Sequence, residues 1–374
     1  MRSDGLFDAL YARGGVAAQT DGRAWLDAML DVEAALARAC AAEELIPLAS
    51  ANAIADACRG ERFDLAAIAE ATGDSATPVI AIVAALRDAV GEQVAPDVHL
   101  GATSQDIIDT AAMLVSRRAL KPLLADAAAS AAGAAALAEA HRASLMAART
   151  LLQRAQLSTF GLRAAGWLVG LDEASDRLRE VAATRLAVQM GGPVGSRPAA
   201  VGTRLAEELG LAEATLPWGA IRVRPAELAC ALGVLAGVFA KVARDVELFA
   251  QNEVAELREG GGPGRGGSSA MAHKRNPVAS VAILACTTRV PGLVATMLAA
   301  MAQEHERAAG AWQAEWGTLS DLLTLVGSAA AWSADLLANL EVDVGRMQKN
   351  AAGLDGSLDG VGPLIDRALA VSAR

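Results

Sequence analysis

The chain is poor in several residue types, and what it lacks is informative. It has 4 cysteines, 12 prolines and 3% aromatic residues among 374, with a formal net charge of −10. The cysteines show neither CxxC nor Cys/His spacing, which argues against a zinc motif and predicts reduced thiols and a cytoplasmic location. An acidic chain has no general attraction for nucleic acid or an anionic membrane, so we expect neither as a partner. An anionic ligand would have to be bound by local cations.

Long uninterrupted apolar runs are also missing. No basic segment precedes an apolar run at the N-terminus, so no signal peptide is expected. The apolar stretch 228–240, between Glu227 and Lys241, is shorter than the ~18 residues that suggest a membrane span. This pattern, too, predicts no membrane partner.

Proline is absent from 123–192, 226–262 and 292–362, and these stretches are rich in good helix formers. No sustained apolar/polar alternation indicates strands. Apolar residues recur at helical spacing in two stretches, Leu235, Phe239, Val242, Val246 and Phe249, and Leu26, Met29, Leu30, Val32, Leu36 and Cys40. We therefore predict an all-α protein with a central bundle of long helices. Because such helices are apolar on more than one face, we expect association with further copies.

The segment 260–278 reads GGGPGRGGSSAMAHKRNPV and admits three interpretations. A phosphate loop is excluded, because Arg265 and Gly267 stand where that motif needs its own spacing and lysine, and a helix precedes the segment. A flexible linker accounts for the glycines alone. Asn276 and Pro277 are typical of a helix N-cap and first turn, launching a helix over 278–287. We favour a mobile lid that folds over an anion and presents backbone N–H groups to it.

Three stretches together carry a family resemblance. GSSAMAHKRNP in the glycine-rich segment, VHLGATSQDIIDT (98–110) and LMAARTLLQRAQLSTFG (145–161) resemble, in order and spacing, the shared motifs of the fumarase/aspartase superfamily. The resemblance implies an all-helical homotetramer with a central helical bundle, each active site drawing on three subunits. It also implies an N-terminal helical domain (1–110), a central bundle carrying the loop 260–277 (111–345), and a shortened C-terminal domain (346–374).

The same resemblance assigns roles to individual residues. Ser268 matches the catalytic serine, whose alkoxide takes or returns the proton next to a carboxylate and needs support from Lys274 and loop N–H groups. His99 precedes the first motif and is expected to give a supporting hydrogen bond. Residues expected to bind the carboxylates of the substrate are Thr103, Ser104, Thr150, Gln153, Ser269, Met271, Lys274 and Asn276.

Structural readings compete with several of these roles. Thr103, Ser104 and Thr150 are individually typical of caps and turns. His99 alone is typical of a surface or satisfied interior histidine, and we favour Arg149 as a structural ion-pair partner. Helix initiation requires only the Asn276–Pro277 pair, so it leaves Ser268 and Lys274 unexplained.

Departures from the motifs bear on the reaction. The second motif usually carries a histidine, acting as or near the general acid, where this chain has Leu151, and Ser75 in GDSATP aligns with another histidine of adenylosuccinate lyase. A carboxylate leaving group needs no such acid, because its conjugate acid has a pKa near ~4. The 3-carboxy-cis,cis-muconate cycloisomerases use a carboxylate in this way. The chain resembles that group in LFDALYA, MLDVEAALARA, GDSATP, VHLGATSQD and QEHERAAGAWQAEWGTLSD.

This second resemblance implies an isomerase that lactonises a small tricarboxylate in the protocatechuate branch of aromatic catabolism, with no metal or organic cofactor. His305 and Arg307 are candidates for binding the third carboxylate, and a surface ion-pair cluster with Glu304 and Glu306 is an equal alternative. Ala272 replaces the usual loop proline, which predicts a looser lid. The rival functions are a related lyase, such as a C–N lyase like adenylosuccinate lyase, and a catalytically silent structural tetramer.

Overall fold

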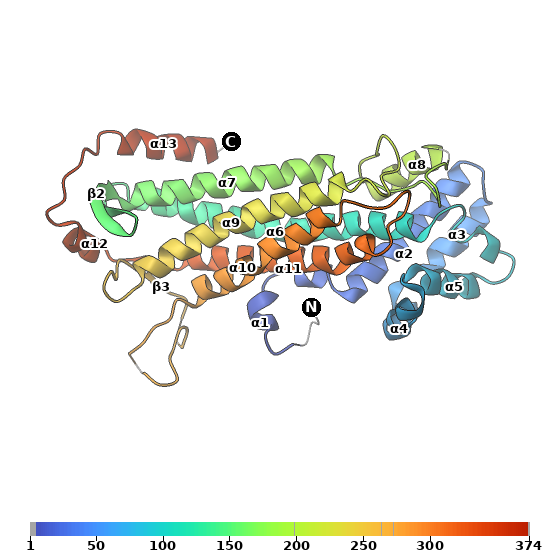
Figure 1. The fold of residues 1–374 in the computed structure, drawn as a ribbon, viewed down its shortest axis with the longest axis horizontal. Coiled ribbons are helices and arrows are strands. Elements are labelled where there is room, and N and C mark those ends of the chain that lie inside the picture. Colours follow the sequence, from blue (N-terminus) through green and yellow to red (C-terminus); the bar gives the residue numbers. More distant parts are fainter. Residues whose placement is uncertain (1–4, 198, 263, 272, 373–374) are drawn as a thin grey trace.

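The computed structural model describes residues 5–197, 199–262, 264–271 and 273–372. The described chain forms an elongated bundle of long helices with a cluster of shorter helices at one end (Figure 1). The α-helices are α1 (Asp8–Tyr11), α2 (Gly22–Ala42), α3 (Leu48–Ala57), α4 (Leu65–Ser75), α5 (Val79–Val90), α6 (Ser104–Ala140), α7 (Phe160–Thr184), α8 (Ala199–Leu209), α9 (Val223–Phe249), α10 (Val278–Ala299), α11 (Ala311–Ala338), α12 (Val344–Ala351) and α13 (Val361–Ser372). The expected all-α, fumarase/aspartase-like architecture is confirmed.

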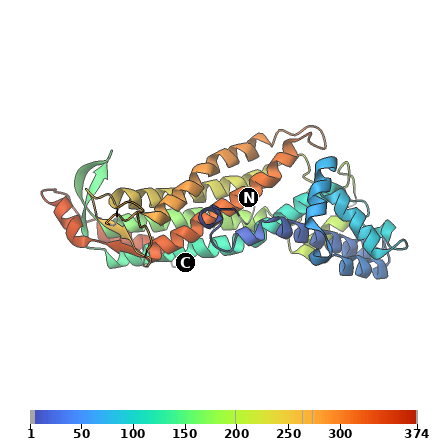
Figure 2. The same ribbon diagram turned by 90° about the horizontal axis from the view of Figure 1, so that it is seen from below.

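Five long helices make the bundle: α6, α7, α9, α10 and α11 run along the long axis of the molecule, as two perpendicular views show (Figures 1 and 2). The longest, α6, has 37 residues and so spans about 55 Å. It packs against α7 and α11, while α10 packs against α9 and α11. One helix therefore connects the two ends of the molecule.

The core follows the helical spacing of apolar residues. The stripe expected from Leu235 to Phe249 is buried along α9, and the stripe from Leu26 to Cys40 is buried along α2. Short polar side chains begin several helices by accepting backbone N–H groups, as Asp21 does at α2 and Thr159 at α7. Burial and capping thus agree on where these helices lie.

The short helices α3–α5 and the 21-residue α2 gather near α8 at one end of the bundle, and 3₁₀ turns Ala17–Gln19, Gly60–Arg62 and Ala95–Asp97 connect parts of this region. The expected domain boundary at residue 110 falls inside α6, and the one at residue 345 falls inside α12. At the other end α13 folds back along α7 (Figure 1). The division into three domains remains a prediction.

In the part of the chain that the structure describes, four short strands interrupt the helices, although the sequence showed no strand pattern. β1 (Leu145–Thr150) pairs antiparallel with β2 (Gln153–Thr159), and β3 (Leu257–Glu259) pairs antiparallel with β4 (Leu340–Val342). The interpretation of 123–192 as part of an all-helical chain is therefore wrong for 145–159. Good helix formers fill this stretch, but Leu151 and Leu152 take positive φ values of 49° and 66° and turn the chain into a hairpin.

The expectation that no segment is apolar enough for a membrane also needs correction. By length and composition alone, α6, α9, α10 and α11 each contain an 18-residue window apolar enough to cross a bilayer. The sequence argument counted uninterrupted apolar runs, whereas these windows average over scattered charges. Only 33% of the α6 window and 39% of the α10 window are buried within the chain, so much apolar surface is left uncovered.

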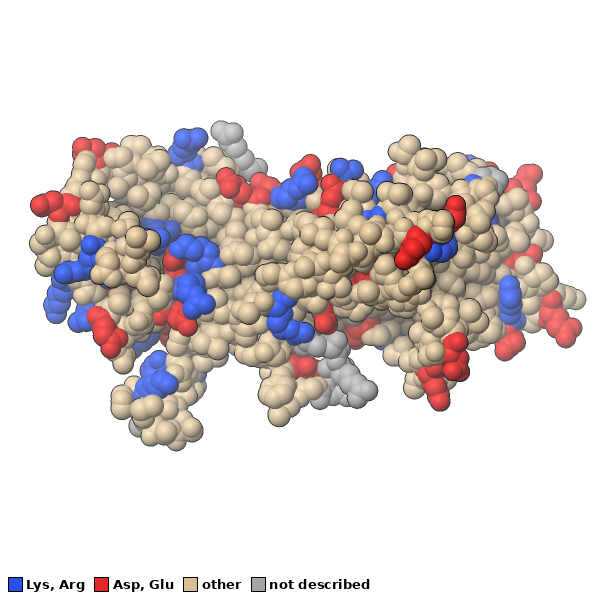
Figure 3. All heavy atoms as spheres, viewed as in Figure 1, with Lys and Arg blue, Asp and Glu red and all other residues tan. Residues whose placement is uncertain are grey.

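Figure 3 shows how the charged side chains are distributed over one face of the molecule. The middle of the face seen in Figure 1 carries few charged side chains, and Lys, Arg, Asp and Glu gather toward its edges and ends. Val234 on α9 is 56% exposed, and Val281 and Leu298 on α10 are 48% and 46% exposed. A contiguous uncharged face of this kind is typical of an interaction surface.

Candidate functional site

The residues expected to form the active site lie in three places on the chain. Ser268, Ser269, Met271, Lys274 and Asn276 lie on the loop between β3 and α10. Thr150 and Gln153 lie at the tip of the β1–β2 hairpin, near the same end of the bundle (Figure 1). The third group, Ser75, His99, Thr103, Ser104, His305 and Arg307, lies around the opposite end, where α4, the start of α6 and the α10–α11 connection are found (Figure 1). One copy of the chain therefore does not bring them together.

The loop is closed at its base by a backbone contact. Asn276 donates its N–H to the carbonyl of Gly266 at 2.8 Å, and its side-chain amide reaches the carbonyl of Gly267 at 3.4 Å. Gly266 has φ of 72°, and a Cβ there would lie 2.4 Å from the Asn276 carbonyl oxygen, so this position requires glycine. Gly266 and Asn276 thus hold together the two ends of the segment that carries Ser268, Ser269, Met271 and Lys274, which is the segment expected to act as a lid.

Two backbone N–H groups converge on the Ser268 hydroxyl. The N–H groups of Ala270 and Met271 donate to Ser268 Oγ at 3.3 and 3.2 Å. Donors placed in this way stabilise negative charge on oxygen, as an alkoxide requires. Ser268 is half-buried and Ser269 is exposed. Ala272 lies outside the described residues.

Beneath the lid lies a hollow of about 1020 Å³. Met271, Lys274 and Asn276 of the lid line it, together with segments 250–259 and 341–344. Lys274 is exposed, so its ammonium group is accessible to an anion. Ser268 is not part of this lining, and in the arrangement observed the serine and the lysine do not face one common cavity.

The start of α10 differs from the sequence expectation. The helix begins at Val278 as predicted, but Asn276 does not cap it. The carboxylate of Glu259 on β3 does so instead, accepting the N–H groups of Ala279 at 2.8 Å and Ser280 at 2.9 Å and the Ser280 hydroxyl at 2.7 Å. A carboxylate suits a helix N-terminus better than a neutral amide, because it also interacts favourably with the helix dipole. Asn276 is left to close the lid.

The hairpin tip carries Thr150 and Gln153 as an exposed cross-strand pair. Between them Leu151 and Leu152 are 96% and 73% exposed. Behind the tip, Arg149 forms the expected structural ion pair: its two terminal nitrogens donate to the fully buried Glu256 carboxylate at 3.0 and 2.7 Å. The hairpin is therefore anchored to the bundle through Arg149 while its tip stays uncovered.

At the opposite end, Asp106 holds the loop that carries His99 and Thr103. Its carboxylate accepts the N–H of Thr103 at 3.0 Å, those of Gly191 and Gly192 at 3.0 and 2.9 Å, and the side-chain amide of Gln189 at 3.0 Å. Burial raises the pKa of Asp106, and the hydrogen bonds from Gly191 and Thr103 act in the opposite direction. Thr103 and Ser104 thus open α6 from a fixed position.

His99 forms a close pair with a residue that the sequence motifs did not single out. Its Nδ1 donates to Oε1 of Glu33 on α2 at 2.6 Å, and the Glu33 side chain is 1% exposed. A signal was present in the sequence, because Glu33 lies three and four positions from Leu30, Met29 and Leu36 of the apolar stripe. A charged residue on a buried stripe indicates a polar partner inside the fold.

The remaining expected residues at this end are Ser75, Arg307 and His305. Ser75 Oγ donates to the backbone carbonyls of Ala71 and Thr77, as a residue ending a helix does. Arg307 donates to the carbonyls of Gly192 and Glu306, at 2.5 and 2.7 Å. His305 is exposed. Across the described ranges, neither His305 nor Arg307 forms an ion pair with Glu304 or Glu306, so the alternative of a surface ion-pair cluster is not what the structure shows.

A buried charge cluster lies close by and was also missed. Arg222 donates to both Asp109 on α6 and Glu315 on α11, with N–O distances of 2.7 and 2.5 Å, and each of the three side chains is 5% exposed or less. Burial alone would lower the pKa of Arg222, but the attraction of Asp109 and the hydrogen bonds to Glu315 outweigh it and raise that pKa. The cluster joins the start of α9 to two bundle helices.

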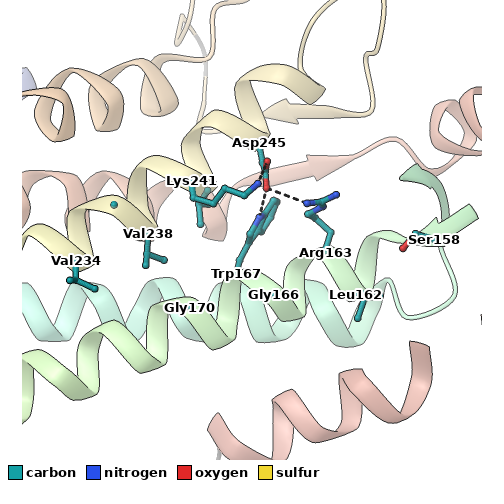
Figure 4. A pocket seen from close by; sticks show the side chains of 12 residues that line it. Ser158, Leu162, Arg163, Gly166, Trp167, Gly170, Val234, Val238, Lys241 and Asp245 are labelled. Carbon is teal, nitrogen blue, oxygen red and sulfur yellow. Dashed lines mark hydrogen bonds and ion pairs between the residues drawn. The ribbon is translucent and has the colours of Figure 1, made fainter. Parts of the chain in front are cut away.

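A separate groove of about 550 Å³ runs between α7 and α9 (Figure 4). Its lining includes glycines 166, 170 and 237 and valines 234 and 238. It also includes Asp245, which accepts a hydrogen bond from Trp167 and forms ion pairs with Arg163 and Lys241. No residue of the expected site lines this groove. Over the described part of the chain, no group of three or more His, Cys, Asp or Glu side chains is placed to hold a metal ion.

Comparison with known proteins shows what the chain is similar to. A family model described as Lyase matches residues 7–292. The 3-carboxy-cis,cis-muconate cycloisomerase of Bradyrhizobium diazoefficiens is 46% identical, over 92% of this chain and 78% of that one. The crystal structure of the 3-carboxy-cis,cis-muconate lactonizing enzyme from Pseudomonas putida has a TM-score of 0.88 at 38% identity, covering 98% of this chain and 86% of the other. The nitrosuccinate lyase of Streptomyces davaonensis is 44% identical, over 67% of this chain and 56% of its own.

Proposed function

Because the chain belongs to the lyase family of the fumarase/aspartase superfamily and groups with the 3-carboxy-cis,cis-muconate cycloisomerases, we propose that it closes 3-carboxy-cis,cis-muconate to a carboxymuconolactone. One carboxylate oxygen of the triacid adds to the conjugated double bond, which forms the C–O bond of the lactone. The neighbouring carbon then takes a proton. The substrate carries its own nucleophile, so the enzyme has to select a conformation and stabilise the enolate-like intermediate.

The observation that best supports this proposal is the set of residues at the tip of the β1–β2 hairpin. In the motif that the chain resembles, the position of Leu151 usually carries a histidine that acts as or near the general acid. A leucine cannot transfer a proton. The tip residues Thr150, Leu151, Leu152 and Gln153 include no side chain that titrates near neutral pH. A reaction whose added or expelled group is a carboxylate needs no acid there, because that group is stable as an anion. Loss of the acid therefore favours lactone chemistry over C–N cleavage.

Ser268 is proposed as the proton donor to carbon in the lactonising direction. When its hydroxyl gives up the proton, the alkoxide lies within hydrogen-bond distance of the Ala270 and Met271 N–H groups. Those donors are backbone groups of the lid and need no rearrangement at that moment. Lys274 supplies a mobile positive charge from the same lid, and Asn276 fixes the base of the lid.

We further propose that the active site is assembled from copies of the chain, as a homotetramer. The lid, the hairpin tip and the start of α6 each carry part of the expected carboxylate-binding set. The lid and the hairpin tip lie near one end of the bundle, and the start of α6 lies near the other. Copies arranged head to tail along their bundles would place the start of α6 from one copy beside the lid and hairpin of others. The third carboxylate would then contact Arg307 or His305.

The groove between α7 and α9 is the proposed contact surface for another copy. Its three glycines lack side chains, so a helix from a second chain could approach closely. Lipid is the other environment that would cover apolar helices. However, α6 carries the buried acids Asp106 and Asp109, and α11 carries the buried Glu315 in a charge cluster. Polar interiors of this kind suit a soluble bundle that packs its outer faces against protein.

A second candidate is an elimination that expels a different stable anion from a succinate skeleton. The similarity to a nitrosuccinate lyase favours it. Nitrite, like a carboxylate, leaves without a proton donor, so Leu151 is compatible with either reaction. C–N cleavage of a succinyl amine is disfavoured on the same argument.

The serine assignment is tested by Ser268→Ala. We expect loss of at least about 100-fold in lactonising rate, because removal of a proton-transfer group typically costs 10²–10⁴. The rate is followed by the ultraviolet absorbance of the conjugated triacid, and the mass of the assembly in solution should not change. Ser357→Ala, at an exposed serine between α12 and α13 that belongs to no part of the proposed site, is the matched control. Activity of Ser268→Ala close to that of the unaltered protein would refute the role of the serine.

A further inference from the structure

The pair formed by His99 and Glu33 has features that a purely structural contact does not need. The Glu33 carboxylate is buried on α2, yet its second oxygen, Oε2, has no hydrogen-bond partner among the described residues. His99 Nδ1, at 2.6 Å from Oε1, is the one donor that the described residues provide to this carboxylate. A buried carboxylate with so few donors is costly, so the contact with His99 Nδ1 is the main stabilising interaction of Glu33 among the described residues.

The backbone also holds the imidazole ring in place. His99 has φ of 62°, a left-handed conformation that is unusual for a residue with a side chain. The N–H of Ala102 donates to the His99 carbonyl at 3.3 Å, and the Arg197 guanidinium donates to the carbonyl of Leu100. The turn that carries His99 is thus fixed on both sides, immediately before Thr103 and Ser104.

The other ring nitrogen is available. No hydrogen bond of Nε2 is formed within the described ranges, and Nε2 is absent from the fully buried polar atoms that lack a partner. The His99 side chain is 14% exposed. Because the partner of one ring nitrogen decides the role of the other, the contact with Glu33 leaves Nε2 as the atom that can meet a ligand.

We propose that Glu33 is a positioning residue that orients His99 so that Nε2–H of the imidazolium binds a carboxylate of the substrate. The inference rests on the proposed function, because it uses a polycarboxylate as the ligand. In the proposed complex the ring is protonated on both nitrogens, and it donates one hydrogen bond from Nδ1 to Glu33 and one from Nε2 to a carboxylate oxygen of the substrate. Thr103 and Ser104, which directly follow the same turn, supply further donors for the same carboxylate.

The test is a kinetic comparison of Glu33→Gln, His99→Gln and the double variant. Glutamine at position 33 keeps the size of the side chain but removes the charge that holds the imidazolium. We expect KM for 3-carboxy-cis,cis-muconate to rise about 10-fold in each single variant, with kcat changed less than about 2-fold. This is the result of losing a charge-assisted hydrogen bond that has the same strength in the ground state and in the transition state. The double variant should show no further rise, because both changes remove the same interaction.

A structural role would give another result. A destabilised fold lowers the number of active molecules and therefore kcat, while KM stays constant. Glu43→Gln, at the end of the same helix and ion-paired with Arg204 at the surface, is the matched control and should change neither constant. Should Glu33→Gln fail to assemble, His99→Gln leaves α2 intact and carries the same prediction.

Binding of tricarballylate, a saturated tricarboxylate, separates this inference from the proposed function. Calorimetry should show binding to the unaltered protein that weakens about 10-fold in Glu33→Gln and His99→Gln. If the unaltered protein binds tricarballylate in this way but does not convert the triacid, the proposed function fails and the inference stands. If KM and tricarballylate affinity are the same in both single variants as in the unaltered protein, or if that protein binds neither compound, the inference is overturned.

Discussion

Asp106 shows how one side chain fixes several loops of the site. It accepts hydrogen bonds from residues 103, 189, 191 and 192, three of them from backbone N–H groups. The sequence placed Asp106 inside a motif but gave no reason to expect this role. Its partners around residue 190 are separated from it by the whole of α6, β1, β2 and α7. Contacts over such sequence distances depend on tertiary packing, which no local pattern encodes.

Burial of Asp106 predicts a pH dependence of stability. The pKa in the folded protein is raised above the ordinary value of 3.8, so ionisation is less favourable in the folded state than in the unfolded state. The contribution of the protonated carboxyl is complete below about pH 3.8 and is lost as pH rises through the higher folded value. The prediction concerns the difference between two unfolding free energies, that of the unaltered protein minus that of Asp106→Asn. This difference should decrease as pH increases from about 4.

Urea unfolding of both proteins across that pH range measures the difference. Subtracting the variant removes the contribution of every other titrating group. A difference that increases with pH would show that the hydrogen bonds from the N–H groups outweigh burial, and would contradict a raised pKa for Asp106.

For other residues of the candidate site, the contacts expected from the sequence can be compared with those in the structure. Ser268 and Asn276 were assigned from a motif, and their roles stay predictions. The structure shows that Ser268 Oγ accepts the N–H of Ala270 and that the Asn276 amide donates to the Gly267 carbonyl. The cap of α10 was assigned to Asn276 because the Asn-Pro pair is local, yet Glu259 provides it from 20 residues away. Glu33 was missed although it lies within the motif MLDVEAALARA, because its partner is 66 residues distant. The motifs named candidate residues, whose roles stay predictions, and they did not reveal the partners that packing brings to those residues.

At the level of helices and strands, periodicity identified the long helices well. The stripes on α2 and α9 are buried where their spacing placed them. The same reasoning failed at residues 145–159, where alanine, leucine and arginine form a hairpin. Helix propensity differs by only a fraction of a kcal/mol per residue, so strand pairing and a two-residue turn override it.

The cluster of Arg222, Asp109 and Glu315 holds three helices together, and its loss should be costly. Arg222→Met leaves two buried carboxylates without their shared cation, and breaking a buried ion pair in this way typically costs about 3–5 kcal/mol. We expect a destabilisation of that size in urea unfolding at fixed protein concentration.

The matched control is Arg177→Met, which removes an exposed ion pair with Glu180 one helical turn away. Exposed pairs of this kind contribute about 0.5 kcal/mol or less. Equal effects of the two substitutions would mean that the buried cluster has no special role in holding α6, α9 and α11.

For the whole molecule, the central question is what covers the apolar face of the bundle. Gly237 lies in the groove between α7 and α9, and a Cβ placed there meets nothing within 4 Å. Gly237→Leu should therefore fit a single copy without a clash and, by replacing glycine in a helix, stabilise it by up to about 1 kcal/mol. If another copy packs into the groove, the same leucine blocks it.

We thus expect Gly237→Leu to shift the solution mass to a smaller species, measured by light scattering after size exclusion. Gly73→Leu on α4 is the control, since a Cβ at Gly73 also meets nothing within 4 Å and α4 lies outside the bundle. An assembly of unchanged mass would exclude the groove as a contact surface, and binding of the unaltered protein to vesicles would favour lipid over a second copy.

The central claim is that the group added or expelled by this protein is an anion, so that a leucine can stand at the hairpin tip. It is tested most directly by incubating the unaltered protein separately with 3-carboxy-cis,cis-muconate, nitrosuccinate and adenylosuccinate and recording the ultraviolet absorbance of each. We expect loss of the conjugated triacid signal and no change with adenylosuccinate, whereas turnover of nitrosuccinate alone would identify a different anion. Cleavage of adenylosuccinate with the triacid left intact would contradict the claim.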